Sequence, residues 1–165
     1  MGPFPMNAMT TRKILLLAAA FGIGTLLFGC ASAPVRPVTG YTPVIGEKAA
    51  KTAVSMIGRP YKYRGDSPEG FDCSGLVRYS YLTAGLEVPH NTKKLKNISR
   101  PIGLKKMRRG DLMFFKENGT KYSHVGIYLG NNFFVHAPTT GQKVRKDSLA
   151  NPYWKKSFIE VRRFN

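Results

Sequence analysis

After an apolar run near the N-terminus, the hydrophobic residues repeat with two different periods along the chain. Residues 47–57 carry alanine, valine and isoleucine at a spacing of three to four, which predicts an amphipathic helix that ends at Gly58. A second helix is predicted over about 73–84, closed by Gly85. Residues 124–129 alternate instead between large apolar side chains and small or polar ones, which is the period of a half-buried strand.

Further strand signals follow in the C-terminal half. Short apolar runs at 111–116, 133–136 and 158–164, with a turn signal at 130–132, predict three more strands. Helices followed by a meander of strands indicate an α+β fold, with N-terminal helices packed on a small antiparallel sheet. A length of 165 residues, 42% of them hydrophobic, is enough for one domain with its own core.

The first thirty residues have the pattern of an export signal. Arg12 and Lys13 precede an uncharged apolar run at 14–28, which matches the charged and hydrophobic regions of a secretory signal. The run is shorter than the roughly 20 apolar residues of a membrane span. A buried core helix is the alternative, but Gly22 and Gly24 within the run and Gly29 just after it weaken its helix propensity.

The run ends in Leu27-Phe28-Gly29-Cys30, which resembles the lipobox of bacterial lipoproteins, although Phe28 replaces the usual small residue. The resemblance implies cleavage before Cys30 and a lipid anchor on its thiol. Multiple acyl chains would anchor the chain durably, since each buried CH₂ contributes about 0.8 kcal/mol. Ala31 and Ser32 are not the aspartate that marks inner-membrane retention in enteric-type bacteria. In such a cell the resemblance implies anchoring at the periplasmic face of the outer membrane.

The charge of the chain is strongly positive. Twenty-six lysines and arginines against nine acids give a net charge of +17, which will attract polyanions. Residues 1–29 hold two of the bases and no acid, so the remainder keeps 24 against nine, or +15. The bases are spread in short clusters without a zinc-finger, RRM or KH signature. A solvated basic surface, open to lipid head groups and anionic envelope polymers, is therefore favoured over a specific nucleic-acid site.

Cys73, within the segment Phe71 to Val77 (FDCSGLV), is the candidate nucleophile. In the first turn of the second predicted helix, the helix dipole is expected to lower the pKa of its thiol, and Asp72 is a typical N-cap residue. The strands around His124 and His136 can form a hairpin that places the two histidines side by side. His124 could then activate Cys73 while His136 orients the other ring nitrogen of His124.

In combination, these motifs resemble the NlpC/P60 peptidases, papain-like enzymes of bacterial cell-wall turnover. The resemblance runs from about Tyr61 to the C-terminus and looks closest to the small lipoprotein endopeptidases of that family. It rests on FDCSGLV at 71–77, RGDL at 109–112, SHVGIYLG at 123–130, FVHA at 134–137 and NPYWKK at 151–156. It implies a papain-like NlpC/P60 fold and a Cys-His-His triad of Cys73 as nucleophile, His124 as base and His136 as the third polar residue.

The same resemblance assigns roles to the residues around the cysteine. Tyr61 would line the site and assist the oxyanion, with Tyr63 as the alternative tyrosine. Asp72 and Ser74 would contact substrate. His90, in a loop, is expected to be exposed.

The function implied is that of a peptidoglycan endopeptidase that acts by acyl transfer and needs no cofactor. The bond cut is either the D-Ala–diaminopimelate cross-link, which the closest-looking subgroup favours, or the D-Glu–diaminopimelate bond within a stem. A zinc site is not expected, because no CxxC or HxxxH spacing occurs. A non-catalytic wall-binding lipoprotein and a polyanion-binding lipoprotein remain as alternatives, and no feature indicates an oligomeric state.

The chain is thus expected to consist of three parts. Residues 1–29 form a lipoprotein signal peptide, residues 30–46 a lipidated cysteine and a proline-containing tether, and residues 47–165 an NlpC/P60 catalytic domain.

Overall fold

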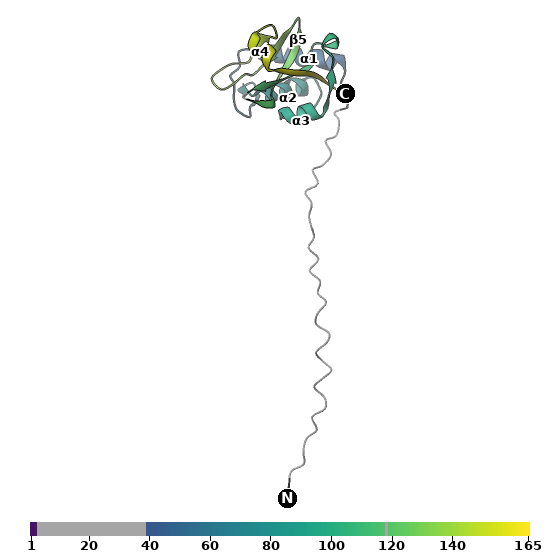
Figure 1. Cartoon of the computed structure of the whole chain (residues 1–165), viewed down its shortest axis with the longest axis vertical. Helices are drawn as coiled ribbons and strands as arrows, with labels where there is room; N and C mark the ends of the chain where they lie inside the picture. The colour runs from purple at the N-terminus through teal and green to yellow at the C-terminus, as the bar shows by residue number, and fades with distance from the viewer. Residues whose placement is uncertain (3–38, 118) are drawn as a thin grey trace. The chain divides into compact units, whose positions relative to one another are not determined.

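The structure is a computed structural model that describes residues 1–2, 39–117 and 119–165 (Figure 1). Residues 3–38 lie outside the described residues; they hold the predicted signal peptide from residue 3 on, Cys30 and the tether up to residue 38. In the part of the chain that is described, no helix has both the length and the apolar character needed to cross a membrane.

Three helices form a layer on one face of the sheet. They are α1 (Pro43–Ser55), α2 (Cys73–Thr83) and α3 (Thr92–Asn97). Each begins at a side-chain cap, since Thr42, Asp72 and Asn91 all accept the backbone N–H three residues further on. The small buried alanines of α1 allow it to pack closely on α2 and on the sheet.

The sheet has six strands in the order β3-β8-β4-β5-β6-β7, and every neighbouring pair is antiparallel. The strands are β3 (Ser99–Ile102), β4 (Leu112–Glu117), β5 (Thr120–Gly130), β6 (Phe133–His136), β7 (Arg145–Ser148) and β8 (Phe158–Phe164). A small hairpin of β1 (Asp66–Ser67) and β2 (Gly70–Phe71), the 3₁₀ turn η1 (Leu104–Lys106) and the helix α4 (Pro152–Ser157) complete the fold. The predicted α+β fold with helices on an antiparallel sheet is confirmed.

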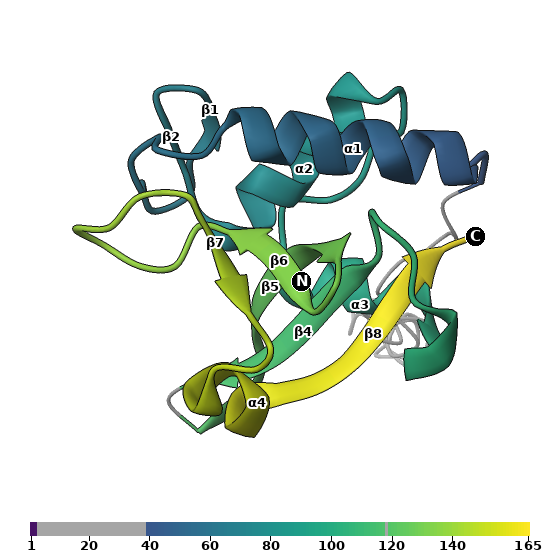
Figure 2. The same ribbon diagram turned by 90° about the horizontal axis from the view of Figure 1, so that it is seen from above.

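The alternation along β5 and β6 separates two buried clusters. Val125, Ile127 and Val135 face the helices and belong to the main core. Tyr128 and Phe134 point to the other face, where they pack in a second cluster that includes Trp154 of α4. Figure 2 shows α1 and α2 along one side of the sheet and α4 at the other.

The start of α1 differs from the prediction. The helix begins at Pro43 rather than Glu47, because Thr42 caps it and proline suits the first helical position, where its missing N–H is not needed. The Tyr41 N–H also donates to the backbone carbonyl of Asn165 at 3.2 Å. Residues 41–46, which the sequence assigned to the tether, are therefore tied to the folded domain.

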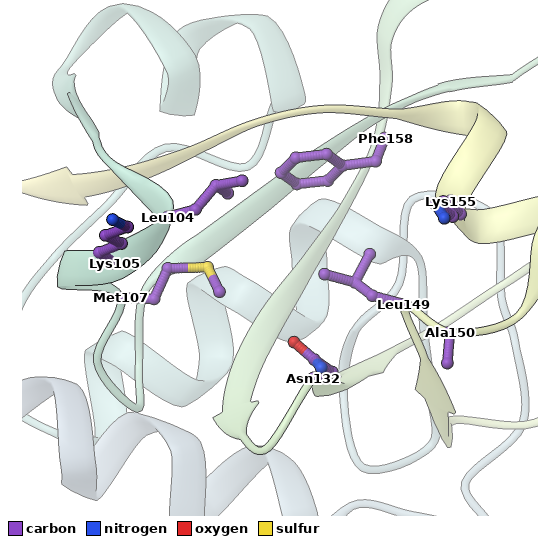
Figure 3. Close-up of a pocket in the computed structure, with 8 residues that line it drawn as sticks. All are labelled: Leu104, Lys105, Met107, Asn132, Leu149, Ala150, Lys155 and Phe158. Carbon is purple, nitrogen blue, oxygen red and sulfur yellow. The ribbon is translucent and has the colours of Figure 1, made fainter.

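A groove lies on the α4 side of the molecule, between η1, β8 and α4 (Figure 3). It has a volume of about 690 Å³ and is lined by Leu104, Met107, Leu149 and Phe158, with Lys105 and Lys155 beside them. None of the predicted site residues lines this groove, and its lining includes no cysteine, serine, threonine, histidine, aspartate or glutamate. The candidate catalytic residues therefore lie elsewhere in the molecule.

Gly75 illustrates how tightly α2 packs. A Cβ at this position would lie 1.9 Å from the carbonyl oxygen of Gly65 and 2.9 Å from Nε2 of His90. Alanine usually favours a helix over glycine by about 1 kcal/mol, but overpacking against a core costs about 1–3 kcal/mol. Because the closest atom belongs to the backbone and cannot rotate away, the clash is expected to outweigh the gain in helix propensity.

We expect Gly75→Ala to lower the free energy of unfolding by about 1–2 kcal/mol in urea titrations. Gly103→Ala is the matched control, since a Cβ there meets nothing within 4 Å and the backbone φ is −65°. Equal stability of the two variants would contradict the packing of α2 against Gly65.

Candidate active site

Cys73 lies in a cleft at the N-terminus of α2. The helix begins there because Asp72 caps it, with Oδ1 accepting the Gly75 N–H at 2.7 Å and the Ser74 hydroxyl at 3.0 Å. The cleft has a volume of about 690 Å³. Its walls come from the loop before β1, the start of α2 and the start of α3, and include Tyr61, Asp72, Cys73, Ser74, His90 and Thr92.

The Cys73 thiol is half-buried and in contact with Thr92, whose Oγ1 is 3.7 Å from Sγ. Burial, followed by the nearby charge of Asp72, raises the pKa of this thiol to about 11. The Thr92 hydroxyl and the backbone N–H of Val125 favour the thiolate, but less strongly. The predicted lowering of the thiol pKa by the helix dipole is therefore wrong, because burial outweighs it.

Two histidines meet on the α4 side of the sheet. His124 of β5 and His136 of β6 are both fully buried, and Nε2 of His124 lies 2.8 Å from Nδ1 of His136. Trp154 stacks on the His124 ring at 5.5 Å and meets the His136 ring edge-on at 4.7 Å. Burial lowers the pKa of both imidazoles, which are therefore neutral at pH 7.

The polar chain continues from His136 to a carboxylate. Nε2 of His136 lies 2.9 Å from Oδ2 of Asp147, which also accepts from Nε of Arg145 and Nε1 of Trp154, each at 2.9 Å. Burial opposes the ionisation of Asp147, but the hydrogen bonds from His136 and Arg145 outweigh it and lower its pKa to about 2. Asp147 is therefore a carboxylate at neutral pH.

The other ring nitrogen of His124 points towards a second acid. Nδ1 lies 3.4 Å from Oε2 of Glu117, whose Oε1 accepts from the Tyr153 hydroxyl at 3.2 Å. Burial raises the pKa of Glu117. Among the described residues, no hydrogen bond joins Cys73 to His124. The thiol instead lies beside Val125, the residue that follows His124 in β5.

The remaining predicted residues also line the cleft. Tyr61 lies close enough for the charge of a Cys73 thiolate to raise the pKa of its hydroxyl, after the larger effect of burial, whereas Tyr63 is 76% exposed. His90 is not the exposed loop residue that was expected. Its Nε2 lies 2.9 Å from each carboxylate oxygen of Asp72, so the turn into α3 folds over the start of α2.

Sequence reasoning missed Asp147, Glu117 and Thr92. Asp147 and Glu117 lie outside the motifs that carry the family resemblance, and Thr92 ends the segment 89–92, which was placed near the cleft but given no role. Each reaches the site through the pairing of strands or the packing of α3 on α2. The one sequence signal for Asp147 and Glu117 is that acidic residues are rare, since the chain has only nine. In residues 39–117 and 119–165, no group of three or more histidine, cysteine, aspartate or glutamate side chains is arranged to hold a metal ion.

A cysteine at a helix N-terminus, against an antiparallel sheet that carries a histidine pair, defines a papain-like α+β domain. Residues 58–163 match the model of the NlpC/P60 family, and the chain belongs to this family. The resemblance inferred from the motifs is confirmed.

Two curated relatives are similar over most of the domain. The murein DD-endopeptidase MepH of Escherichia coli is 37% identical over 126 residues, which cover 71% of this chain and 46% of MepH. The peptidoglycan DL-endopeptidase CwlO of Bacillus licheniformis is 42% identical over 127 residues, which cover 70% of this chain and 27% of CwlO. The chain thus spans less than half the length of either relative.

Among solved structures, a Staphylococcus aureus protein described as similar to a lipoprotein of the NLP/P60 family has the same fold. It superposes with a TM-score of 0.67 and is 32% identical, covering 77% of this chain and 43% of that one.

The raised pKa of Cys73 leads to a prediction for its alkylation. With Cys30 replaced by alanine, Cys73 is the only cysteine. We expect its reaction with iodoacetamide to accelerate about tenfold per pH unit from pH 6 to 9 without a plateau, because only the thiolate reacts. The same measurement in guanidinium chloride, where the thiol regains its ordinary pKa, is the control. A plateau below pH 8 in the native protein would show a preformed thiolate and contradict the neutral resting state.

Proposed function

We propose that this protein is a peptidoglycan endopeptidase that uses Cys73 as its nucleophile. The observation that carries the proposal is the half-buried Cys73 at the start of α2, in a cleft beside the β5 segment with the buried His124–His136 pair. Membership of the NlpC/P60 family supports it, as do the names of MepH and CwlO, which are endopeptidases of murein and peptidoglycan.

The protonation states support attack coupled to proton transfer rather than a preformed ion pair. Cys73 holds its proton at neutral pH and His124 is neutral. When the sulfur–carbon bond forms, the thiol proton passes to Nδ1 of His124. This step requires the Cys73 side chain to exchange its contact with Thr92 for one with the imidazole.

The acyl-enzyme then forms and breaks down in two balanced steps. The tetrahedral oxyanion collapses to a thioester as the carbon–nitrogen bond breaks, and His124 returns its proton to the departing amine. Water, deprotonated by His124, hydrolyses the thioester and restores the thiol. The first N–H groups of α2 and the Tyr61 hydroxyl are suited to stabilise the oxyanion, because helix N-terminal amides have no intrahelical partner.

The substrate proposed is the peptide part of the cell wall. We favour the D-Ala–diaminopimelate cross-link, in line with the DD-endopeptidase MepH. Because CwlO is a DL-endopeptidase, the D-Glu–diaminopimelate bond remains the alternative cleavage site.

The test is digestion of purified sacculi by residues 31–165, with Cys73→Ala as the matched variant. We expect the parent protein to convert cross-linked dimers to monomers, resolved by chromatography and mass spectrometry. The alanine variant is expected to produce no detectable change, because loss of the nucleophile removes the covalent route. Shortened stem peptides with intact cross-links would show that the bond cut is the D-Glu–diaminopimelate bond. If both proteins bind sacculi and neither cleaves them, the result would contradict the enzyme proposal and favour a wall-binding module.

We further propose that Cys30 carries a lipid that anchors the protein in the cell envelope. The lipobox-like segment before Cys30 supports this, as does the S. aureus protein described as similar to a lipoprotein.

Cys30→Ala is expected to abolish labelling by radioactive palmitate in cells and to move the protein from the membrane fraction to the soluble fraction, because thioether-linked lipid needs this thiol. Ser32→Ala, two residues away, is the control and should retain the label. Unchanged labelling of the Cys30 variant would contradict the proposed lipid anchor on this residue.

A further inference from the structure

We propose that Asp147 is a positioning residue for catalysis, which fixes the tautomers of His136 and His124 so that Nδ1 of His124 is left free to accept a proton. This inference rests on the proposed function of Cys73 and His124, and it adds Asp147 to the proposed three-residue site as the third member of a hydrogen-bonded series with His124 and His136.

The direction of the hydrogen bonds from His124 through His136 follows from Asp147, the last residue of the series. An ionised carboxylate can only accept hydrogen bonds, so the 2.9 Å contact with Oδ2 of Asp147 requires the proton of His136 to lie on Nε2. A neutral imidazole has one ring proton, which leaves Nδ1 of His136 as an acceptor. The 2.8 Å contact with His124 then requires the His124 proton on Nε2, and its Nδ1 bears a lone pair.

The opposite tautomers would disrupt the same contacts. If His136 carried its proton on Nδ1, the lone pair of its Nε2 would face the carboxylate of Asp147 at 2.9 Å with no proton between them. His124 would then carry its proton on Nδ1, where it could not act as the base. Only the direction set by Asp147 is both hydrogen-bonded throughout and competent for catalysis.

Glu117 competes with Asp147 from the other end of the chain. A carboxylate near Nδ1 of His124 favours a proton on that nitrogen, which is the inactive tautomer. The contact is 3.4 Å, however, and Glu117 shares its charge with the Tyr153 hydroxyl. Asp147 makes the shorter contact and is ionised at any pH above about 2, whereas burial raises the pKa of Glu117. Asp147 therefore dominates.

Asp147 is itself held in place by its surroundings. Its partner in the β6–β7 register is Phe134, two residues before His136, which brings its side chain to the same face of the sheet. Arg145 and Trp154 each donate to the oxygen that accepts from His136. Trp154 also covers both imidazoles and keeps water from the chain. Such a fixed acceptor costs no reorganisation when the proton moves.

The test is Asp147→Asn, which keeps the size of the side chain but removes its charge and adds a donor group. Asparagine can pair with either tautomer of His136, so we expect kcat on a soluble cross-linked muropeptide to fall about 10- to 100-fold, as for other residues that orient a catalytic group through a second one. KM is expected to change little, because Asp147 does not line the Cys73 cleft.

The pH profile supplies a readout that loss of stability would not produce. The titratable and charged groups around His124 are His136, Asp147, Arg145 and Glu117, and the charge of Asp147 raises the pKa of both histidines. Removing this charge lowers both pKa values. Because His124 must be neutral to accept a proton, the acid limb of kcat/KM is expected to move to lower pH in Asp147→Asn.

Asp111→Asn is the matched control. Asp111 is a buried carboxylate that, like Asp147, is hydrogen-bonded to an arginine (Arg163, at 2.6 Å), and it does not line the Cys73 cleft. This variant is expected to lower Tm while the pH profile and the kcat of the folded enzyme stay unchanged. A parental kcat and pH profile in Asp147→Asn, or the same changes in both variants, would overturn the positioning role.

Nitrogen-15 NMR of the histidine side chains tests the tautomers without any enzyme assay. In the parent protein at pH 7, both His124 and His136 are expected to carry their proton on Nε2, and Asp147→Asn is expected to show a mixture. A proton on Nδ1 of either histidine in the parent would overturn the inference even if Cys73 proves essential. If Cys73→Ala still cleaves sacculi while the Nε2 tautomers are observed, the proposed nucleophile fails but the ordering of the histidines by Asp147 stands.

Discussion

The antiparallel pairing of β5 with β6 is the constraint on which the rest of the site depends. Side chains alternate along both strands, so the register that buries Val125 and Val135 against the helices also sends His124 and His136 to the opposite face. A slip of one residue would exchange the two faces of the slipped strand. The valines would then lose the helical core and the imidazoles would lose each other. Hydrophobic burial therefore fixes the geometry of the polar chain.

The same burial determines the protonation states of the site. Removal from water disfavours every charge, so the thiol of Cys73 and the imidazoles of His124 and His136 are all neutral at pH 7. Asp147 escapes this rule because three donors converge on one of its oxygens. Asp147 thus places a fixed negative charge at the end of the neutral His124–His136 pair, where an imidazolium formed in the proposed reaction would be stabilised.

The sequence predicted the elements with a strong period and missed those without one. The helix from Cys73 and the strands at 124–129, 133–136 and 158–164 were found because their apolar positions repeat. The helix at 92–97 (TKKLKN) and the strand at 145–148 (RKDS) are short and polar, and they are held by tertiary contacts rather than by their own pattern.

The site was predictable to the same extent and for the same reason. Cys73, His124 and His136 lie in or beside periodic segments, whereas Asp147 reaches His136 only through the β6–β7 register, across an eight-residue connection. The pKa of Cys73 was predicted in the wrong direction because the helix dipole can be read from the sequence, but the burial that outweighs it cannot.

The distribution of the acids explains how a chain with such a large positive charge keeps a specific site. Among the described residues, eight of the nine acids, all except Glu87, form a hydrogen bond or an ion pair: Glu69 accepts from Ser67, and the others cap a helix or pair with lysine, arginine or histidine. Few are left to neutralise the surface, and the excess lysines and arginines face solvent. Such a surface attracts anionic polymers over a Debye length of about 8 Å at physiological salt, without selecting among them. Selection must then come from the cleft around Cys73, where Asp72 is held by Ser74, Gly75 and His90.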